Sequence, residues 1–449
     1  MWLRTRPAAF AGIGVLVVLL AAALAAARAE QAPVLSWRDL GVAAFDSVWR
    51  TVNDTYFDPA FGGLDWPAVR DELRPRVAAA ASADDQRAVI GDMLGRLGQS
   101  HFALISSAPD AAALRGPATV PFDVRVVDGA VLVTRVDEQG AVPLRPGDTI
   151  VRIDDRGVPA ILATVDPGDP RRAELSWRLV NAVFSGERGS VVRLAIRSPG
   201  GDVRDVAVER RVGPGDLVTV GNLPPMRTQL DAVERRTANG RRVGVIRFNI
   251  WMAAVGEPFA AAVDRFREAD GLIIDLRGNP GGLADMIRGI AGHVVNEPLV
   301  LGRMRMRGLD LEFRANPRRS TRDGRSVTPF AGPVAVLVDE LTASASECFA
   351  GGLQSLGRAR IFGTRTAGQA LPASTQQLVS GDVLLYAVGD FVTSTGQRLE
   401  GGGVVPDTVV QVEPQALALG HDAEHAALSW FDGGASSTPY GRPQGPPVR

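Results

Sequence analysis

Apolar side chains recur every three or four positions beyond residue 37. In "FDSVWRTVNDTYF", Phe45, Val48 and Tyr56 fall on one face of a 3.6-residue period. The runs "DWPAVRDELRPRV" and "DQRAVIGDMLGRLGQSH" continue this pattern. We therefore predict a small helical domain over residues 37–112.

From about residue 120 the period shortens to two. The runs "FDVRVV", "AVLVTRV", "TIVRIDD" and "VVRLAIR" alternate apolar and polar residues between turn-forming Gly, Pro and Asp, which is typical of strands. The stretch "LRPGDTIVRIDDRG" resembles the PDZ element in which a turn carrying Gly147 and Asp148 leads into a strand. PDZ domains capture peptide tails by adding them as a strand. We predict a PDZ-like β domain over residues 119–213, with a generic β-hairpin as the alternative.

Beyond residue 223 apolar strands alternate with amphipathic helices. The runs "RVGVIRFNIW", "GLIIDLRGNPGG" and "GPVAVLVDE" are typical of strands, and "EPFAAAVDRFREA" and "LADMIRGIAGHVV" of helices. This alternation predicts an α/β domain with a largely parallel sheet over residues 223–415. The last residues, 431–449, are rich in Gly, Pro and Ser and are predicted to be a disordered tail. The fold class is therefore multidomain α/β.

The first residues have the three parts of a secretory signal. Arg4 and Arg6 precede a long apolar run, and "ARA" provides a cleavage site that ends at Ala29. Residues 1–29 therefore predict export, to the periplasm or the medium. The same run is long enough to span a bilayer, so an uncleaved membrane anchor is the alternative.

The composition limits the functions and catalytic groups that are possible. The 449 residues are 45% hydrophobic and 22% charged, which is typical of a globular protein with two or three domains. A net charge of −1 gives no support for a nucleic-acid partner. Cys348 is the single cysteine and is predicted to be a buried structural thiol. All 49 basic residues are arginine, so a lysine side chain is excluded as a catalytic base.

The stretch "LTASASECFAGG" contains the first candidate for chemistry. Ser344 and Glu347 fit the S-x-x-E capping box of a helix start. A serine there also lies beside free amides and the positive end of the helix dipole, which favour negative charge in a transition state. The glycines of "DLRGNPGG" would let a substrate carbonyl approach the backbone, or would only form a tight turn.

The order of these motifs, followed by "EGGGVVPD", resembles that of the S41 peptidases, the carboxy-terminal processing and tricorn-core proteases. The resemblance implies a ClpP/crotonase-like ββα-superhelix catalytic domain that hydrolyses peptides or unfolded proteins without cofactor or metal. It also implies that Ser344 is the nucleophile. The oxyanion hole would be formed by the amides of Ala345 and a glycine, Gly281 in preference to Gly282.

The two branches of this family differ in their catalytic base. The processing branch uses a lysine where "TAGQA" here carries Gln369, and a neutral amide cannot accept the proton of a serine. The tricorn-like branch resembles this chain at "GQSH" and "LEGGGVVPD". That branch implies that His101 is the general base, that Glu400 orients it, and that Ser100 assists through a hydrogen-bond network. Alternatively, each residue has an ordinary structural role in a helix end or turn.

The sequence is also compatible with two functions other than a serine peptidase. A catalytically inactive relative would bind peptides or apolar ligands and would need a wide apolar cavity. The stretch "HDAEH" fits H-x-x-E-H, so His421 and His425 could serve a zinc hydrolase, although a solvated helix is the favoured interpretation. The PDZ-like region has "VPFDVRVV" where a Gly-rich carboxylate-binding loop is expected, so a gate or docking surface is the alternative to tail recognition.

Overall fold

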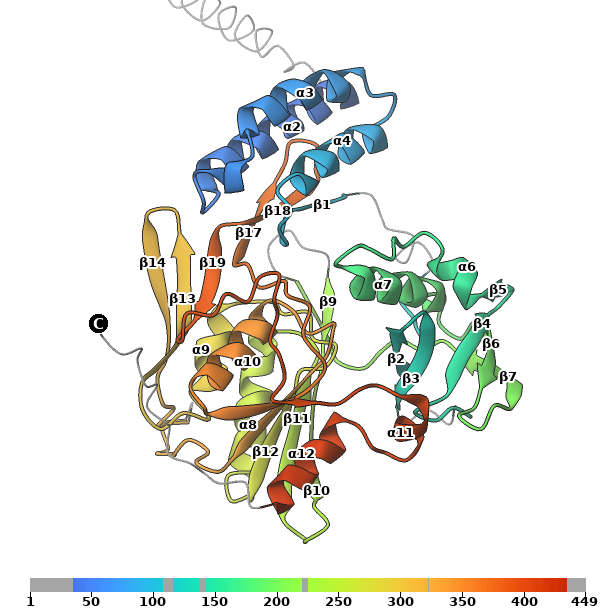
Figure 1. Cartoon of the computed structure of the whole chain (residues 1–449), viewed down its shortest axis with the longest axis vertical. Coiled ribbons are helices and arrows are strands. Elements are labelled where there is room, and N and C mark those ends of the chain that lie inside the picture. Colours follow the sequence, from blue (N-terminus) through green and yellow to red (C-terminus); the bar gives the residue numbers. More distant parts are fainter. Residues whose placement is uncertain (1–34, 108–115, 138–141, 220–224, 322, 434–449) are drawn as a thin grey trace, which may run out of the picture.

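The computed structural model describes residues 35–107, 116–137, 142–219, 225–321 and 323–433. The predicted signal and most of the predicted tail lie outside these residues. Among the described residues, none of the helices combines the length and apolarity needed to cross a membrane. Figure 1 shows a helical layer above a mixed sheet domain, with a smaller β domain at its side.

Three helices form the N-terminal layer, as the apolar period predicts. They are α2 (Trp37–Thr55), α3 (Trp66–Ala79) and α4 (Ala83–Gly95), and a short 3₁₀ turn, η1 (Phe61–Gly63), links the first two. Ser36 and Ser82 cap α2 and α4 by accepting a backbone N–H of the first turn. Phe45 and Trp66 are fully buried between the helices.

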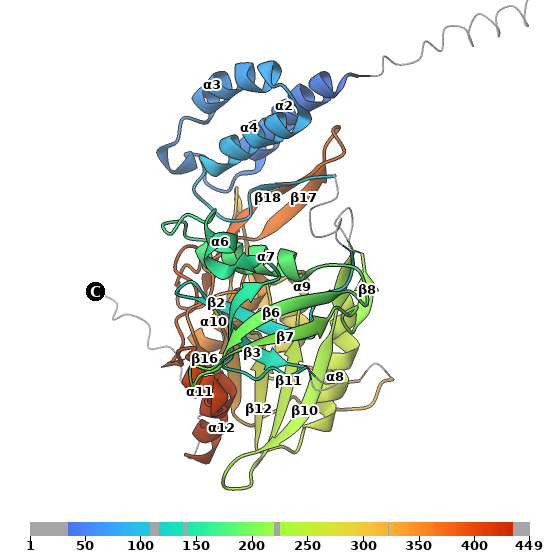
Figure 2. The same cartoon turned by 90° about the vertical axis from the view of Figure 1, so that its right-hand side faces the viewer.

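This layer is completed from far along the chain. Strand β1 (Ala103–Ile105) pairs antiparallel with β18 (Val383–Ala387), which pairs with β17 (Ala373–Gln377). Leu378 and Leu384 of this hairpin belong to the same apolar cluster as the helices. Figures 1 and 2 both show the hairpin directly beneath the helices. The helical layer therefore packs against a hairpin that belongs to the sheet domain.

The β domain is a single antiparallel sheet with the strand order β2-β3-β4-β6-β7. Its strands are β2 (Phe122–Val127), β3 (Ala130–Val136), β4 (Thr149–Ile153), β5 (Arg156–Gly157), β6 (Val191–Arg197) and β7 (Val203–Glu209), with β5 paired to β4. These agree with the runs of period two.

Two helices of the β domain are absent from our sequence prediction, α6 (Val158–Leu162) and α7 (Arg172–Phe184). Ser176, Val180 and Phe184 are buried along one face of α7 at four-residue spacing. This spacing is a signal in "RAELSWRLVNAVF" that sequence analysis could have used.

The sheet domain contains the predicted parallel core. Its strand order is β10-β11-β12-β15-β16-β20, with β10 antiparallel at the edge and the others parallel. The strands are β10 (Leu230–Arg236), β11 (Arg242–Phe248), β12 (Gly271–Asp275), β15 (Val334–Val338), β16 (Ala359–Gly363) and β20 (Thr408–Val409).

Helices cover both faces of this sheet. One face carries α8 (Gly256–Arg265), α9 (Asp285–Ala291) and α10 (Ala345–Ser355), and the other carries α12 (Ala423–Asp432). Because both faces are covered, β12 and β15 are buried at every position.

Smaller elements complete the domain. They are η2 (Ala253–Val255), α11 (Pro414–Ala418), the pair β8 (Asp216–Val218) and β9 (Met226–Thr228), and the sheet of β13 (Leu299–Met306), β14 (Leu309–Ala315) and β19 (Gly389–Thr393). Helix α12 ends at Asp432, so its last two residues overlap the predicted tail of residues 431–449. Phe431 is buried on the outer face of the sheet, where Gly271 leaves room for its ring.

Candidate active site

Ser344 is held in a sharp turn between β15 and α10. Its backbone angles are φ 55° and ψ −119°, which a residue with a side chain rarely adopts. Strained strand-to-helix turns of this kind expose a nucleophile at the helix start. The Ser344 amide donates to the carbonyl of Gln369 at 2.8 Å and to Glu347 Oε2 at 3.1 Å, so the glutamate half of the predicted capping box is present.

The Ser344 hydroxyl lies within hydrogen-bond distance of a histidine. Ser344 Oγ and His101 Nε2 are 3.1 Å apart. His101 lies between α4 and β1 and also has a positive φ, 58°. The two residues are 243 positions apart in the sequence, and the fold brings them together.

Two further residues continue this contact into a chain. His101 Nδ1 lies 2.7 Å from Ser100 Oγ, and Ser100 Oγ donates to Glu400 Oε2 at 2.9 Å. The Ser100 amide donates to Glu400 Oε1 at 2.7 Å, and the Ala370 amide donates to Glu400 Oε2 at 2.8 Å. Ser100 therefore links Glu400 to His101 by hydrogen bonds.

This chain fixes the tautomer of the imidazole. A hydroxyl carries one proton, and Ser100 gives it to Glu400. Ser100 Oγ must then accept from His101 Nδ1–H, which leaves Nε2 without a proton and facing the Ser344 hydroxyl. The arrangement is that of a base ready to accept the serine proton.

Burial keeps the imidazole neutral. It lowers the pKa of His101 from 6.5 to about 4, while the charge of Glu174 acts in the opposite direction. At neutral pH the Nε2 lone pair is therefore available. A protonated imidazole could not accept a proton from Ser344.

The two glycines of "NPGG" have different neighbours. A Cβ on Gly281 would lie 2.6 Å from Ser344 Cβ and 2.9 Å from the Ala345 nitrogen, whereas a Cβ on Gly282 would lie 2.5 Å from the Trp251 carbonyl oxygen. Gly281 is thus the one beside Ser344. Its amide donates to Asn279 Oδ1 at 3.0 Å.

The Ala345 amide is a second backbone N–H beside Ser344. Ala345 begins α10, so its N–H has no acceptor within the helix.

Glu347 is a residue of this region to which sequence analysis gave only a capping role. It is fully buried, and its carboxylate accepts hydrogen bonds from the Thr366 hydroxyl, the Gly368 amide at 2.8 Å and the Gln369 amide at 2.9 Å. Burial raises its pKa from 4.5 to about 7. Glu347 therefore ties the "TAGQA" loop to the amide of Ser344.

Within the described part of the chain, the side chain of Gln369 hydrogen-bonds to the β domain. Its Nε2 donates to Glu174 Oε2 of α7 at 3.0 Å. Cys348 is buried in α10, and burial raises the pKa of its thiol well above the ordinary value. Its burial agrees with the structural role predicted for it.

The zinc alternative finds no support in the described residues. The rings of His421 and His425 are 4.7 Å apart, but Asp422 between them pairs with Arg277. Across the described ranges, no group of three or more His, Cys, Asp or Glu side chains is arranged to hold a metal ion.

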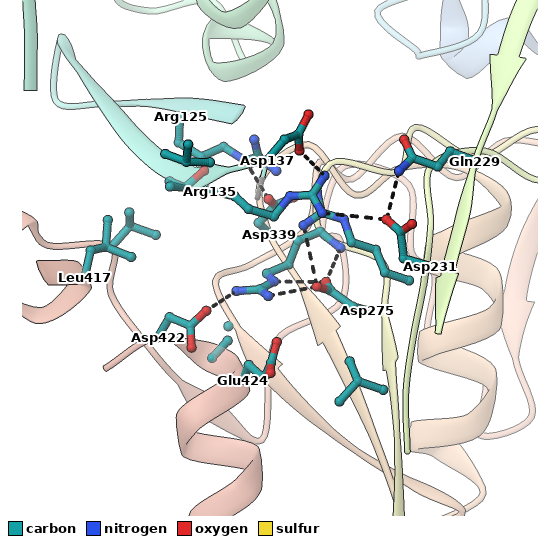
Figure 3. Close-up of a pocket in the computed structure, with 18 of the residues that line it drawn as sticks. Arg125, Arg135, Asp137, Gln229, Asp231, Asp275, Asp339, Leu417, Asp422 and Glu424 are labelled. Carbon is teal, nitrogen blue, oxygen red and sulfur yellow. Dashed lines mark hydrogen bonds and ion pairs between the residues drawn. The ribbon is translucent and has the colours of Figure 1, made fainter. Parts of the chain in front are cut away.

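A cavity of about 830 Å³ lies between the β domain and the sheet domain. Figure 3 shows Arg125 and Arg135 reaching from β2 and β3 toward Asp339 and Asp231. Ser344 and His101 are not among the residues that line it. Ion pairs such as Arg277 with Asp275 line it beside apolar side chains such as Val245 and Leu417.

Comparison with known proteins identifies the domain that carries Ser344. Residues 242–410 match the model of peptidase family S41, and residues 43–95 match that of the tricorn protease C1 domain. Residues 242–410 are an S41 peptidase domain. The family consists of serine-type peptidases, and the chain is therefore a serine peptidase.

Relatives from both branches match most of the chain. A carboxyl-terminal-processing protease of Picosynechococcus sp. is 27% identical over 83% of this chain and 83% of its own. Tricorn protease homolog 1 of Streptomyces coelicolor is 26% identical over 87% of this chain and 34% of its own. The solved photosystem II D1 C-terminal processing protease has a TM-score of 0.53 at 24% identity, covering 86% of this chain and 96% of its own. That structure shares the mixed α/β fold with N-terminal helices.

Proposed function

We propose that the chain is an exported serine peptidase that hydrolyses peptides or unfolded proteins through an acyl-enzyme on Ser344. The observation that carries the proposal is the hydrogen-bond chain from Ser344 Oγ through His101 and Ser100 to Glu400. Export rests on the signal-like sequence of residues 1–29.

In the first step Ser344 Oγ attacks the substrate carbonyl carbon and gives its proton to His101 Nε2. The imidazolium that forms donates through Nδ1 to Ser100, whose own proton points to Glu400. The carboxylate thus stabilises the new positive charge through one intervening hydroxyl.

The oxyanion of the tetrahedral intermediate would be bound by the amides of Ala345 and Gly281. The Ala345 amide is free of helical partners, but the Gly281 amide donates to Asn279 Oδ1 and must turn from it or share its proton. Gly282 is the less suitable donor, because its backbone lies against Trp251.

The intermediate then collapses as His101 gives its proton to the leaving amine, which breaks the C–N bond. Water enters, His101 takes a proton from it, and the hydroxide attacks the acyl carbon. Return of that proton to Ser344 Oγ releases the acid product and restores the enzyme.

The finer architecture belongs to the same proposal. We assign the β domain as PDZ-like because its edge strand, β2, lies against helix α7. This arrangement would let a peptide join the sheet as an additional strand. The sheet domain is assigned to the ClpP/crotonase-like class by its family. Residues 119–213 would then present or gate substrates for the domain over residues 223–415.

Degradation of an unfolded protein tests the proposal. Reduced, alkylated casein would be incubated with the chain starting at Glu30, with Ser344→Ala and with His101→Ala, each with and without EDTA. We expect cleavage by the wild type that survives EDTA and is lost in both variants, by about 10³-fold or more. Cleavage that EDTA stops, or that Ser344→Ala retains, would contradict a serine mechanism.

A further inference from the structure

An acidic side chain of the β domain lies at the candidate active site. Glu174, in the first turn of α7, accepts a hydrogen bond from Gln369 Nε2 at 3.0 Å. The carbonyl oxygen of Gln369 accepts the amide of Ser344 at 2.8 Å. The charge of Glu174 also acts on His101. Glu174 is therefore linked to Ser344 through one residue, Gln369, and lies within electrostatic reach of His101, although it comes from a different domain.

The charge of Glu174 is only weakly compensated. Its side chain is 35% exposed, and its ion-pair partner, Arg178, lies at 3.6 Å with a side chain that is 66% exposed. Such exposed pairs, four residues apart on a helix, contribute little. Gln369 is a neutral donor. The carboxylate thus keeps acceptor sites and net charge for another partner.

The carboxylates of the interdomain cavity contrast with it. Asp275 and Asp339 are almost fully buried and have arginine partners that are themselves buried or largely so, Arg277 and Arg125. Their charges are already compensated within the protein. Glu174 is an acid beside the reacting groups that remains open to solvent.

The arginine that lies beside the candidate site is already paired. Arg398 donates to the Glu400 carbonyl at 3.3 Å and forms an ion pair with Asp390 at 2.7 Å. The hydrogen bonds that hold Ser344, His101 and Ser100 in place come from serine, histidine and glutamate. Where the processing branch carries a lysine, this chain has Gln369, and that side chain is turned to Glu174. The local charge is therefore negative where relatives of that branch have a positive group.

We propose that Glu174 is a substrate-binding residue that pairs with a basic side chain of the peptide, an arginine or lysine flanking the scissile bond. The inference rests on the proposed peptidase function. In the resting protein Gln369 occupies one oxygen of the carboxylate. A guanidinium or ammonium would bind the same group with the stronger, charge-assisted hydrogen bonds. The β domain would then take part in sequence selection as well as in presenting substrate.

The test uses quenched fluorescent peptides that are identical except at one position. Arginine, norleucine or glutamate would be placed in turn at each of the two positions on either side of the cleaved bond. The ratio of kcat/KM for the arginine and norleucine peptides would be measured for the wild type, Glu174→Gln and Glu174→Arg. Asp205→Asn is the matched control, because it removes one acid from the far edge strand of the same domain, where Asp205 is 79% exposed.

We expect the wild type to prefer arginine by about twofold to fivefold at one position, a size typical of a partly exposed charge pair. Glu174→Gln should bring the ratio near one, and Glu174→Arg should favour the glutamate peptide. Asp205→Asn should keep the wild-type ratio. A wild type that cleaves every peptide equally, or a preference that Glu174→Gln retains, would overturn the inference alone. No turnover of any peptide would overturn the proposed function and this inference with it.

Discussion

At the scale of single residues, Ser100 is the link between His101 and Glu400. In the proposed mechanism the carboxylate would orient the imidazole through the Ser100 hydroxyl. Because the Ser100 hydroxyl donates its single proton to Glu400, it accepts from His101 Nδ1–H, and His101 Nε2 is left to accept from the Ser344 hydroxyl. The strained backbone of both His101 and Ser344 fits a site held in place by the surrounding structure.

The pH dependence of kcat/KM tests the state of His101. Its pKa is lowered from 6.5 to about 4 by burial, so it is neutral above about pH 5 and its proton-accepting role is lost below pH 4. We expect the acid limb of kcat/KM to have its midpoint near 4. An acid limb centred near 6.5 would show instead that the imidazole is solvated.

Unfolding must be followed separately in that experiment. The unfolded state binds a proton to His101 near pH 6.5, whereas the folded state does so only near 4. The contribution of His101 to the free energy of unfolding is therefore fully present above pH 6.5 and is lost as the pH falls from 6.5 to about 4. Circular dichroism at each pH would separate loss of structure from loss of the base.

At the scale of secondary-structure elements, the sequence predicted those elements whose pattern is local. The apolar strands β12 and β15 and the helix after Ser344 were expected, because a strand buried on both faces and a helix start each have their own sequence signal. Helix α7 was missed, since it lies among runs of period two and its apolar stripe is short. The pairing of β18 with β1 could not be expected, because it joins segments about 280 residues apart, such as Ala103 and Leu385.

The candidate site divides in the same way. Ser344, His101, Ser100 and Glu400 were named from short motifs, and the structure brings them into contact. Glu174 had no such motif. Its place depends on how the β domain lies against the "TAGQA" loop, which is a property of tertiary structure. The asymmetry between Gly281 and Gly282 likewise depends on the position of Trp251.

At the scale of the whole molecule, the β domain is joined to the sheet domain by buried charges. Arg125 Nε donates to Asp339 Oδ2 at 2.6 Å, and both side chains are about 6–7% exposed. Asp339 Oδ1 also accepts the amides of Gly278 at 2.9 Å and Leu341 at 3.1 Å. One carboxylate thus links the β domain, the glycine loop and the turn that leads to Ser344.

Replacing Arg125 tests this joint. Arg125→Met would leave Asp339 buried without a counter-charge, and we expect the free energy of unfolding to fall by about 3–5 kcal/mol. Arg152→Met is the matched control, because its pair with Asp205 is exposed and should contribute less than about 1 kcal/mol. The first transition in urea would be compared for the two variants. Equally small decreases in the free energy of unfolding for the two variants would contradict a buried ion pair between the domains.

The central claim is that His101 activates Ser344, and the rate of covalent labelling measures this most directly. A fluorophosphonate probe would be added to the wild type, His101→Ala and His425→Ala, and the modified residue identified by mass spectrometry. His425 is exposed on α12 and serves as the control. We predict labelling of Ser344 at equal rates in the wild type and His425→Ala, and labelling slower by about 10²-fold or more in His101→Ala. Equal labelling in His101→Ala, or labelling at a residue other than Ser344, would contradict the account.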